Sequence, residues 1–269
     1  MTTDARRSPI PEFVFVCGAV GSGNTFMFGS LTKDEHVYGI NEDGLGTTMR
    51  NFLRPENAST CPHAIDEFVA FVHRLRHDRR TLILKTPSNI RFATNIREYL
   101  PNSRFIVMIR EPHAAVVSGI SRHGERYSIE DIARIWLSDY EHLAEAGDDS
   151  VVITFDELVS DPTAALSRVA EFLPLGPEVF TYATRVNRPD RSTSEWWKSK
   201  IDEPVQHEVE RWVAKLGLAE IYRAAQGNAA AHGPGARVTQ RDALAGYRFL
   251  APLVAARKQV FRAWYRLTR

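Results

Sequence analysis

The sequence predicts an α/β fold with a central parallel sheet, helices on both faces and a nucleotide-binding loop of the P-loop type. Three observations lead to this prediction. Short apolar runs alternate with helical patterns along the chain, as strands and crossover helices do around a parallel sheet. The first run, Phe13–Cys17, is followed at once by the glycine-rich turn Gly18–Thr25. The run Arg104–Ile109 is apolar nearly throughout, which is typical of strands covered on both faces.

The individual elements follow in chain order. Strands are predicted at Phe13–Cys17, Thr81–Lys85, Arg104–Ile109 and Val151–Phe155. Helices are predicted from Asn24, over Asn89–Leu100, from Glu111-Pro112, over Ile132–Leu143 (apolar at 132, 135, 136, 140 and 143) and over Asp161–Leu173. Early prolines and a capping aspartate mark two of these starts. Leu31–Asn57 and Asn187–Glu203 are less regular, and irregular segments in compact domains are usually functional loops.

Composition favours a globular, soluble protein. The 269 residues are 43% hydrophobic and 25% charged, and the two cysteines are too few for a disulfide framework. No apolar run approaches the ~20 residues of a membrane span. A cytoplasmic location is therefore expected.

Charge divides the chain into two predicted parts, a domain over residues 1–228 and a linker with a basic tail over residues 229–269. The tail carries eight Arg or Lys residues against Asp242, a charge of +7, so the first part sums to −6 for the total of +1. Such a body does not favour nucleic acid. After Pro252 the tail predicts a basic amphipathic helix, which could dock on the protein itself or give peripheral contact with a membrane.

The turn Gly18–Thr25 matches the phosphate-loop pattern of glycine, four residues, glycine, lysine and Ser/Thr, except that Asn24 replaces the lysine. A strand, a glycine-rich turn and a helix N-terminus still form a cradle of backbone N–H groups for an anion. The point charge that reaches the outer phosphates of ATP is missing. The loop therefore predicts a phosphorylated nucleotide bound by something other than an ordinary NTPase.

Three segments together resemble a known family. The loop, Leu84–Asn89 and Phe105–Ser118 are similar to sulfotransferases that use 3′-phosphoadenosine 5′-phosphosulfate (PAPS), nearest in motif style to the tyrosylprotein and carbohydrate-type branch. Val151–Leu173 resembles the same family, and the similarity runs from Phe13 to about Leu175. The resemblance implies PAPS as co-substrate, no metal, and transfer of a sulfuryl group to a hydroxyl acceptor. The class of the acceptor stays open among carbohydrate, lipid or lipid-linked molecule, peptide and small molecule.

The resemblance also implies site residues. The 5′-phosphosulfate would bind the loop residues Gly21, Ser22, Gly23, Asn24 and Thr25. The 3′-phosphate would bind Arg110 and Ser118, whose guanidinium and hydroxyl suit a phosphate. Lys85 would act on the transferring group and Glu42 would be the base that takes the acceptor's proton. The family often has a basic residue where this chain has Gly21, which places more weight on Lys85.

Several alternatives stay open. Asp43, Glu35 and His36 are rivals of Glu42 as the base. Each functional role also has a structural alternative. The glycine-rich loop could be a turn without a ligand, Arg110 could form an ordinary salt bridge, and Lys85 could reach into solvent. His73 and His77 lack a third ligand, so no metal site is expected.

Two late segments also have two interpretations each. Arg188 and Arg191 could close over the nucleotide or lie in solvent, and Trp196-Trp197 is expected to cover the core rather than line an acceptor pocket. The rival functions are a nucleotide kinase or NTPase with a degenerate loop, and a catalytically inactive nucleotide-binding regulatory protein.

Overall fold

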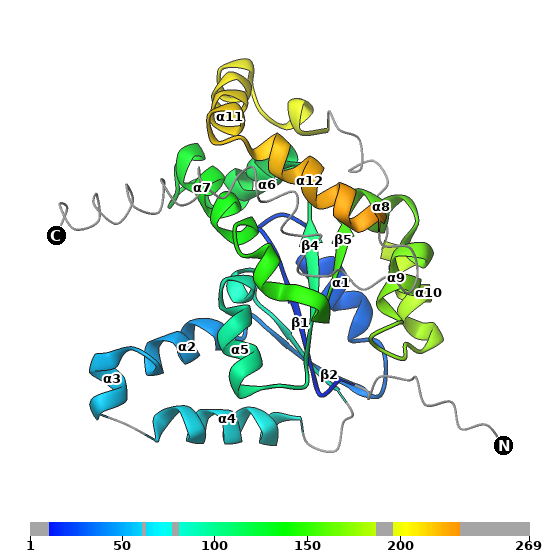
Figure 1. Ribbon diagram of the computed structural model, residues 1–269. Coiled ribbons are helices and arrows are strands. Elements are labelled where there is room, and N and C mark those ends of the chain that lie inside the picture. The colour runs from blue at the N-terminus through cyan, green and yellow to red at the C-terminus, as the bar shows by residue number, and fades with distance from the viewer. Residues whose placement is uncertain (1–10, 61–62, 77–80, 187–195, 232–269) are drawn as a thin grey trace.

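The computed structural model describes residues 11–60, 63–76, 81–186 and 196–231 (Figure 1). Five strands form one sheet in the order β2-β3-β1-β4-β5, and every pairing is parallel. Their bounds are β1 Phe13–Cys17, β2 Val37–Asn41, β3 Thr81–Lys85, β4 Ser103–Ile109 and β5 Ser150–Thr154. The predicted α/β class with a central parallel sheet is confirmed.

Helices connect the strands and continue after β5. Before β4 these are α1 Asn24–Leu31, α2 Leu45–Phe52, α3 Pro55–Thr60, α4 Ala64–Leu75, the 3-10 helix η1 Pro87–Phe92 and α5 Ala93–Tyr99. Between β4 and β5 they are α6 Pro112–His123, α7 Ile129–Tyr140 and η2 Leu143–Asp149. After β5 they are α8 Phe155–Ser160, α9 Pro162–Val169, α10 Pro177–Val186, η4 Trp196–Lys200, α11 Glu203–Leu216 and α12 Leu218–Ala231.

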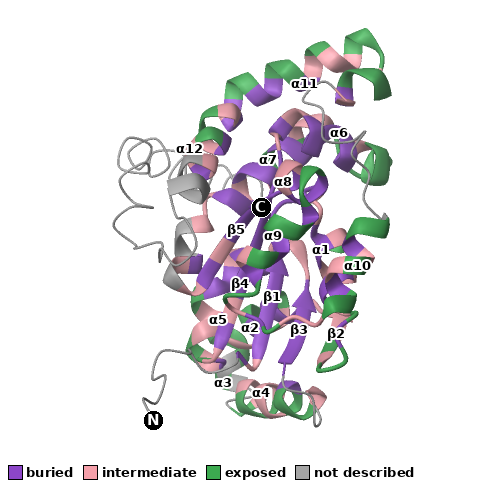
Figure 2. Ribbon diagram, turned by 90° about the vertical axis from the view of Figure 1, so that its right-hand side faces the viewer, coloured by how far each residue is buried: buried purple, intermediate pink, exposed green. Residues whose placement is uncertain are grey.

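Alternating side chains divide the apolar core into two layers, one on each face of the sheet. On β1, Phe13 and Phe15 enter the layer formed with α5, α6, α7, α11 and α12. Val14 and Val16 enter the other layer, with α1, α8, α9 and α10. The central strands are therefore buried on both sides, and Figure 2 shows them as a buried band between exposed helix surfaces. This burial explains why their sequences are continuously apolar.

The structure differs from the sequence-based expectations in two connections. The interval Leu31–Asn57, expected to be irregular, contains the edge strand β2, the helix α2 and the first residues of α3. An edge strand is covered less than a central one, and β2 has no fully buried residue and contains Gly39, so its sequence lacks the apolar signal. Phe155, expected to end a strand, is instead the first residue of the helix α8, which Thr154 caps.

The C-terminal part is described only to Ala231. The first residues of the expected linker, Ala229 to Ala231, continue α12. The basic amphipathic helix predicted after Pro252 lies outside the described residues. Among the helices that are described, none combines the length and the apolar character that crossing a bilayer requires.

Candidate functional site

A cavity of about 720 Å³ opens at the carboxyl edge of the sheet, where ligands bind in open α/β folds. All five strands supply a lining residue just beyond their ends: Gly21 after β1, Glu42 after β2, Lys85 at the end of β3, Arg110 after β4 and Phe155 after β5. Its volume falls within the range of small-molecule sites. The parallel register thus brings the predicted site residues to one place.

The glycine-rich loop presents an open helix N-terminus to this cavity. Gly21 and Gly23 have φ values of +84° and +92°, which non-glycine residues rarely adopt. No side chain caps α1, so the first amides of this helix remain available to an anion. Thr25 is exposed and lines the cavity beside them.

Two other loop side chains hold the backbone in shape. Asn24 donates from Nδ2 to the carbonyl oxygens of Gly18 (3.3 Å) and Ala19 (3.0 Å), so the residue in the lysine position closes the loop on itself. The buried Ser22 hydroxyl lies 3.2 Å from the hydroxyl of Tyr140, which in turn donates to the carbonyl oxygen of Met108. Ser22 therefore anchors the loop to α7 and β4 through its side chain.

Gly21 packs directly against α6, which explains why no side chain occupies this position. A Cβ atom there would lie 2.9 Å from the carbonyl oxygen of Ala115 and 3.0 Å from the Cβ atom of Ser118. The positive φ and the contact both disfavour a basic side chain in this loop conformation. Two cationic side chains line the same cavity from other elements, Lys85 at the end of β3 and Arg110 just after β4.

We expect Gly21→Lys to weaken binding of 3′-phosphoadenosine 5′-phosphate at least ten-fold rather than restore a lost charge. The left-handed backbone costs a non-glycine residue about 1–2 kcal/mol, and the side chain must push the loop away from α6. Isothermal titration of the variant, with Gly44→Lys as a control at a left-handed glycine with no neighbour within 4 Å of its Cβ position, measures the effect. Tighter binding or faster turnover of Gly21→Lys contradicts this explanation.

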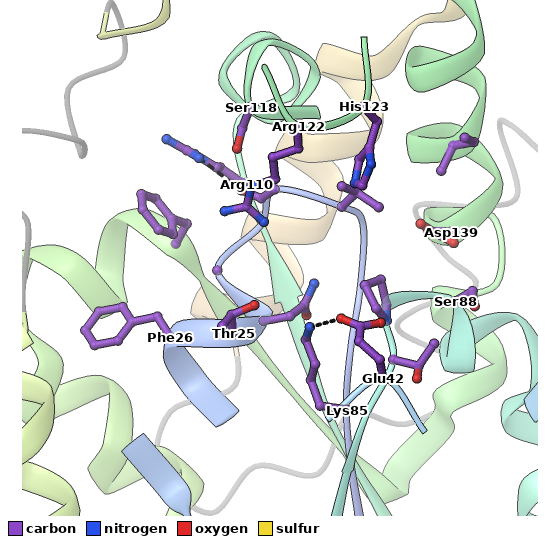
Figure 3. Close-up of a pocket in the computed structure, with 18 of the residues that line it drawn as sticks. Thr25, Phe26, Glu42, Lys85, Ser88, Arg110, Ser118, Arg122, His123 and Asp139 are labelled. Carbon is purple, nitrogen blue, oxygen red and sulfur yellow. Dashed lines mark hydrogen bonds and ion pairs between the residues drawn. The ribbon is translucent and has the colours of Figure 1, made fainter. Parts of the chain in front are cut away.

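Arg110 lies beside the loop and is held in a fixed orientation. Its Nη1 donates to the carbonyl oxygen of Gly21 at 2.9 Å. Its guanidinium lies 4.0 Å from the ring centroid of Phe155 and 5.1 Å from that of Trp196, within the range of cation–π attraction. Ser118 lies on the same side of the cavity (Figure 3). The predicted pair is thus brought together next to the loop.

The half-buried carboxylate of Asp156 interacts electrostatically with Arg110. Asp156 attracts the guanidinium and accepts a hydrogen bond from the Tyr222 hydroxyl at 3.3 Å. Burial raises the pKa of Asp156, while the Tyr222 hydrogen bond and the Arg110 charge lower it. Through Tyr222, α12 connects the C-terminal helices to this part of the site.

Lys85 and Glu42 form an ion pair at the centre of the cavity (Figure 3). Asn41 is the register partner of Lys85, so Glu42 comes one residue beyond it, and its backbone N–H donates to the Lys85 carbonyl oxygen at 2.7 Å. The ammonium is nearly buried, whereas the carboxylate is 59% exposed. Among the described non-glycine residues Glu42 alone has a positive φ, +55°. Such strain is concentrated at functional sites.

The rivals for the base do not occupy equivalent positions. Asp43 accepts hydrogen bonds from Thr86, Asn89 and the Leu45 backbone, which makes it part of the turn after β2. Burial raises its pKa, and these hydrogen bonds oppose the increase. Glu35 and His36 are exposed, lie 3.7 Å from one another and do not line the cavity.

The cavity also contains an Arg–Asp pair that was not predicted from the sequence. Arg91 on η1 donates from Nε to Oδ1 of Asp139 on α7 at 2.5 Å, and both residues line the cavity. Asp139 is 1% exposed, and its Oδ2 has no hydrogen-bond partner in the described part of the chain. A signal existed: position 139 falls at helical spacing among the apolar residues of α7, where a carboxylate is unexpected. Arg122 and His123, at the end of α6, also line this cavity.

Burial raises the pKa of Asp139 to about 6, although the Arg91 charge opposes the increase. Between its unfolded value of 3.8 and about 6, the folded protein holds a proton that the unfolded chain has lost. The free energy of unfolding therefore falls as pH rises through this window. We expect Asp139→Asn to remove this decrease, so that the variant gains up to about 3 kcal/mol relative to wild type between about pH 4 and about pH 7. Urea unfolding of both proteins at a series of pH values measures this difference. Parallel plots of unfolding free energy against pH for wild type and Asp139→Asn would contradict the prediction.

The two tryptophans have different roles. Trp197 is buried in the core and stacks on His113 with ring centroids 5.0 Å apart, as expected, whereas Trp196 lines the cavity. The predicted loop residues Arg188 and Arg191 lie outside the described residues. Within the described ranges, no group of three His, Cys, Asp or Glu side chains is arranged to hold a metal ion.

Comparison with known proteins gives one family and one fold. A family model described as "Sulfotransferase family" matches residues 13–177. Among solved structures, the sulfotransferase domain from the Synechococcus PCC 7002 olefin synthase is similar with a TM-score of 0.52 and 16% identity, over 80% of this chain and 98% of that one. A sulfotransferase from Alicyclobacillus acidocaldarius has a TM-score of 0.49 and 17% identity, over 78% and 95% of the two chains. No curated protein sequence matches significantly. At 16% identity, the similarity to the olefin synthase domain supports the fold alone.

Proposed function

The chain belongs to the sulfotransferase family, and from this we propose that it transfers a sulfuryl group from PAPS to a hydroxyl group of an acceptor. The observation that carries the proposal is the meeting of three parts in one cavity. These are the open N-terminus of α1 with its glycine loop, the Arg110–Ser118 pair, and the Lys85–Glu42 ion pair. Each part matches one chemical need of the reaction.

The donor's two anionic ends suit two separate parts of the cavity. Loop amides, the Thr25 hydroxyl and the α1 dipole would hold the 5′-phosphosulfate. Arg110 and Ser118 would hold the 3′-phosphate, since the guanidinium is a planar set of donors that phosphate oxygens accept. Phe26, Phe155, Tyr182 and Trp196 line the same region and offer ring faces on which a purine can stack. These binding groups together therefore suit PAPS as the sulfuryl donor.

The same cavity fits ATP less well. Asn24, in the position of the phosphate-loop lysine, uses its amide nitrogen to bind the loop's own carbonyls. It brings no positive charge to a γ-phosphate. The cations near the loop come from other elements, Lys85 at the end of β3 and Arg110 just after β4, which suits a ligand with a second phosphate away from the chain of linked phosphates.

The Lys85–Glu42 pair accounts for the transfer step. The acceptor oxygen forms a bond to sulfur while the bond from sulfur to the bridging oxygen of the 5′-phosphate breaks, and 3′-phosphoadenosine 5′-phosphate leaves. The acceptor's proton passes to Glu42, whose Oε2 remains for it because Oε1 accepts from Lys85. The Lys85 ammonium stabilises the negative charge that develops on the bridging and sulfuryl oxygens.

Thermal unfolding with added nucleotide tests the donor assignment. We expect 3′-phosphoadenosine 5′-phosphate to raise the Tm of the full chain far more than ATP with Mg²⁺ at equal concentration, because a ligand at 100 times its Kd stabilises by about 2.7 kcal/mol. Transfer of ³⁵S from labelled PAPS to a mixture of hydroxyl acceptors then tests the activity. A larger stabilisation by ATP with Mg²⁺ would refute the proposal.

A further inference from the structure

The cavity extends beyond the Lys85–Glu42 pair, away from the phosphate-binding parts. In the view of Figure 3, Thr25 and Phe26 lie on one side of this pair, and Ser88 and Asp139 lie on the other. The far part is lined by Pro87, Ser88, Arg91, His123, Ile135 and Asp139, and we name it the acceptor end. Four of these six side chains are polar, so this end suits a polar molecule.

From this end of the cavity we infer, on the basis of the proposed function, that the acceptor is a polyhydroxylated molecule of the carbohydrate class. One of its hydroxyls would receive the sulfuryl group while a neighbouring hydroxyl donates a hydrogen bond to Asp139. The inference rests on the Asp139 carboxylate and on the charges around it.

The Asp139 carboxylate has one oxygen paired and one unpaired. Arg91 Nε donates to Oδ1 at 2.5 Å, and Oδ2 has no partner among the described residues although the side chain is 1% exposed. An unpaired buried acceptor is costly, and a hydrogen-bond donor from a ligand relieves the cost. The terminal torsion of aspartate is soft, so one oxygen can turn to the cavity while the other keeps Arg91. The raised pKa agrees, because the protein compensates the ionised form incompletely.

The surrounding charges favour a neutral hydroxyl over an ammonium group as that donor. Asp139 already has a cationic partner in Arg91. Arg122 also lines the cavity, and its positive charge would repel an amine. A hydroxyl supplies the hydrogen bond without adding charge.

A site built to accept a hydrogen bond discriminates strongly against molecules that lack the donor, because its polar group is then left unpaired. A monohydroxy alcohol of similar shape should therefore be a poor acceptor. The same reasoning makes Asp139→Asn informative. The amide can still accept from Arg91 through its oxygen, but its NH₂ replaces the unpaired acceptor with a donor.

The experiment compares acceptors in pairs with the full chain and labelled PAPS. Methyl glucoside, galactoside and mannoside carry ring hydroxyls beside a primary alcohol, whereas cyclohexylmethanol carries the primary alcohol alone. A methyl glucosaminide tests the amine. We expect at least one glycoside to exceed both cyclohexylmethanol and the glucosaminide in kcat/KM by roughly ten-fold or more. Asp139→Asn should remove that advantage while the KM for PAPS stays unchanged.

The control is Glu130→Gln, an exposed acid of the same helix that does not line the cavity. Binding of 3′-phosphoadenosine 5′-phosphate by each variant shows that the donor end is intact. Cyclohexylmethanol or the glucosaminide as the best acceptor overturns the inference, as does an equal loss for glycoside and alcohol in Asp139→Asn. If the protein binds 3′-phosphoadenosine 5′-phosphate but transfers sulfate to none of the glycosides, the inference about the acceptor is also overturned, while the assignment of PAPS as donor stands. Failure to bind the nucleotide contradicts the proposed function instead.

Discussion

Glu42→Gln is expected to lower kcat for sulfuryl transfer by about 10²–10⁴-fold, the usual contribution of a positioned general base. The amide keeps the size and one oxygen of the carboxylate but cannot take the acceptor's proton. Binding of 3′-phosphoadenosine 5′-phosphate should change little, because Glu42 is an anion that makes no favourable contact with phosphate. Steady-state kinetics with labelled PAPS, together with titration of the nucleotide, separates the two effects.

Lys85→Met tests the other half of the pair and is expected to cost about 10²–10³-fold in kcat, as removal of an electrostatic stabiliser does. Methionine keeps the apolar stem of this nearly buried side chain, and the carboxylate left behind is 59% exposed, so folding should be preserved. Because the two groups act on the same step, the double variant should lose less than the product of the single losses.

Glu35→Gln is the matched control, since this acid is exposed, lies near Glu42 in sequence and does not line the cavity. Its kinetics should equal those of wild type. If Glu42→Gln also retains full activity while Asp43→Asn loses it with folding intact, the base is Asp43 and our assignment is wrong.

The sequence predicted the central strands well because burial on both faces leaves a strong signal. Phe13–Cys17 and Thr81–Lys85 have the bounds in the structure that the apolar runs predicted. The edge strand β2 was missed since only one neighbour, β3, pairs with it, and its residues are half-buried or exposed. The position of Glu42 beside Lys85 depends on that strand. The resemblance to sulfotransferases could name Glu42, but no local pattern predicts the ion pair.

The residue pair at the acceptor end could not be predicted either, because it depends on how distant elements pack. Arg91 and Asp139 are 48 residues apart, and they meet only because α7 packs against η1. The apolar spacing of α7 predicted a helix, and its one buried acid marked a position that needed a partner. Which partner it has follows from tertiary packing. Motifs within one loop can therefore be predicted from the sequence, whereas contacts between residues of different elements can be predicted only when the fold is known.

Arg110→Ala is expected to weaken binding of 3′-phosphoadenosine 5′-phosphate by roughly 10²-fold or more and binding of AMP far less. Hydrogen bonds to a charged group contribute about 1.5–3 kcal/mol each, and a guanidinium can give two to one phosphate. AMP has the 5′-phosphate but lacks the 3′-phosphate, so the ratio of the two affinities isolates the group that Arg110 is proposed to bind. Titration of both nucleotides into wild type and variant gives that ratio.

Removing Arg110 also removes its hydrogen bond to the Gly21 carbonyl, which could loosen the loop and weaken both nucleotides. Arg110→Lys separates the two effects: it keeps a positive charge but loses the planar pair of donors, so an intermediate loss restricted to the 3′-phosphate nucleotide is expected. Arg104→Ala, at a residue of β4 that is paired with Asp149 away from the cavity, should bind as wild type does. An equal loss for both nucleotides in Arg110→Ala and Arg110→Lys would mean that Arg110 only supports the loop. The 3′-phosphate would then need another cation. Among the cations that line the cavity, Arg122 on α6 is the nearest to Arg110 in sequence.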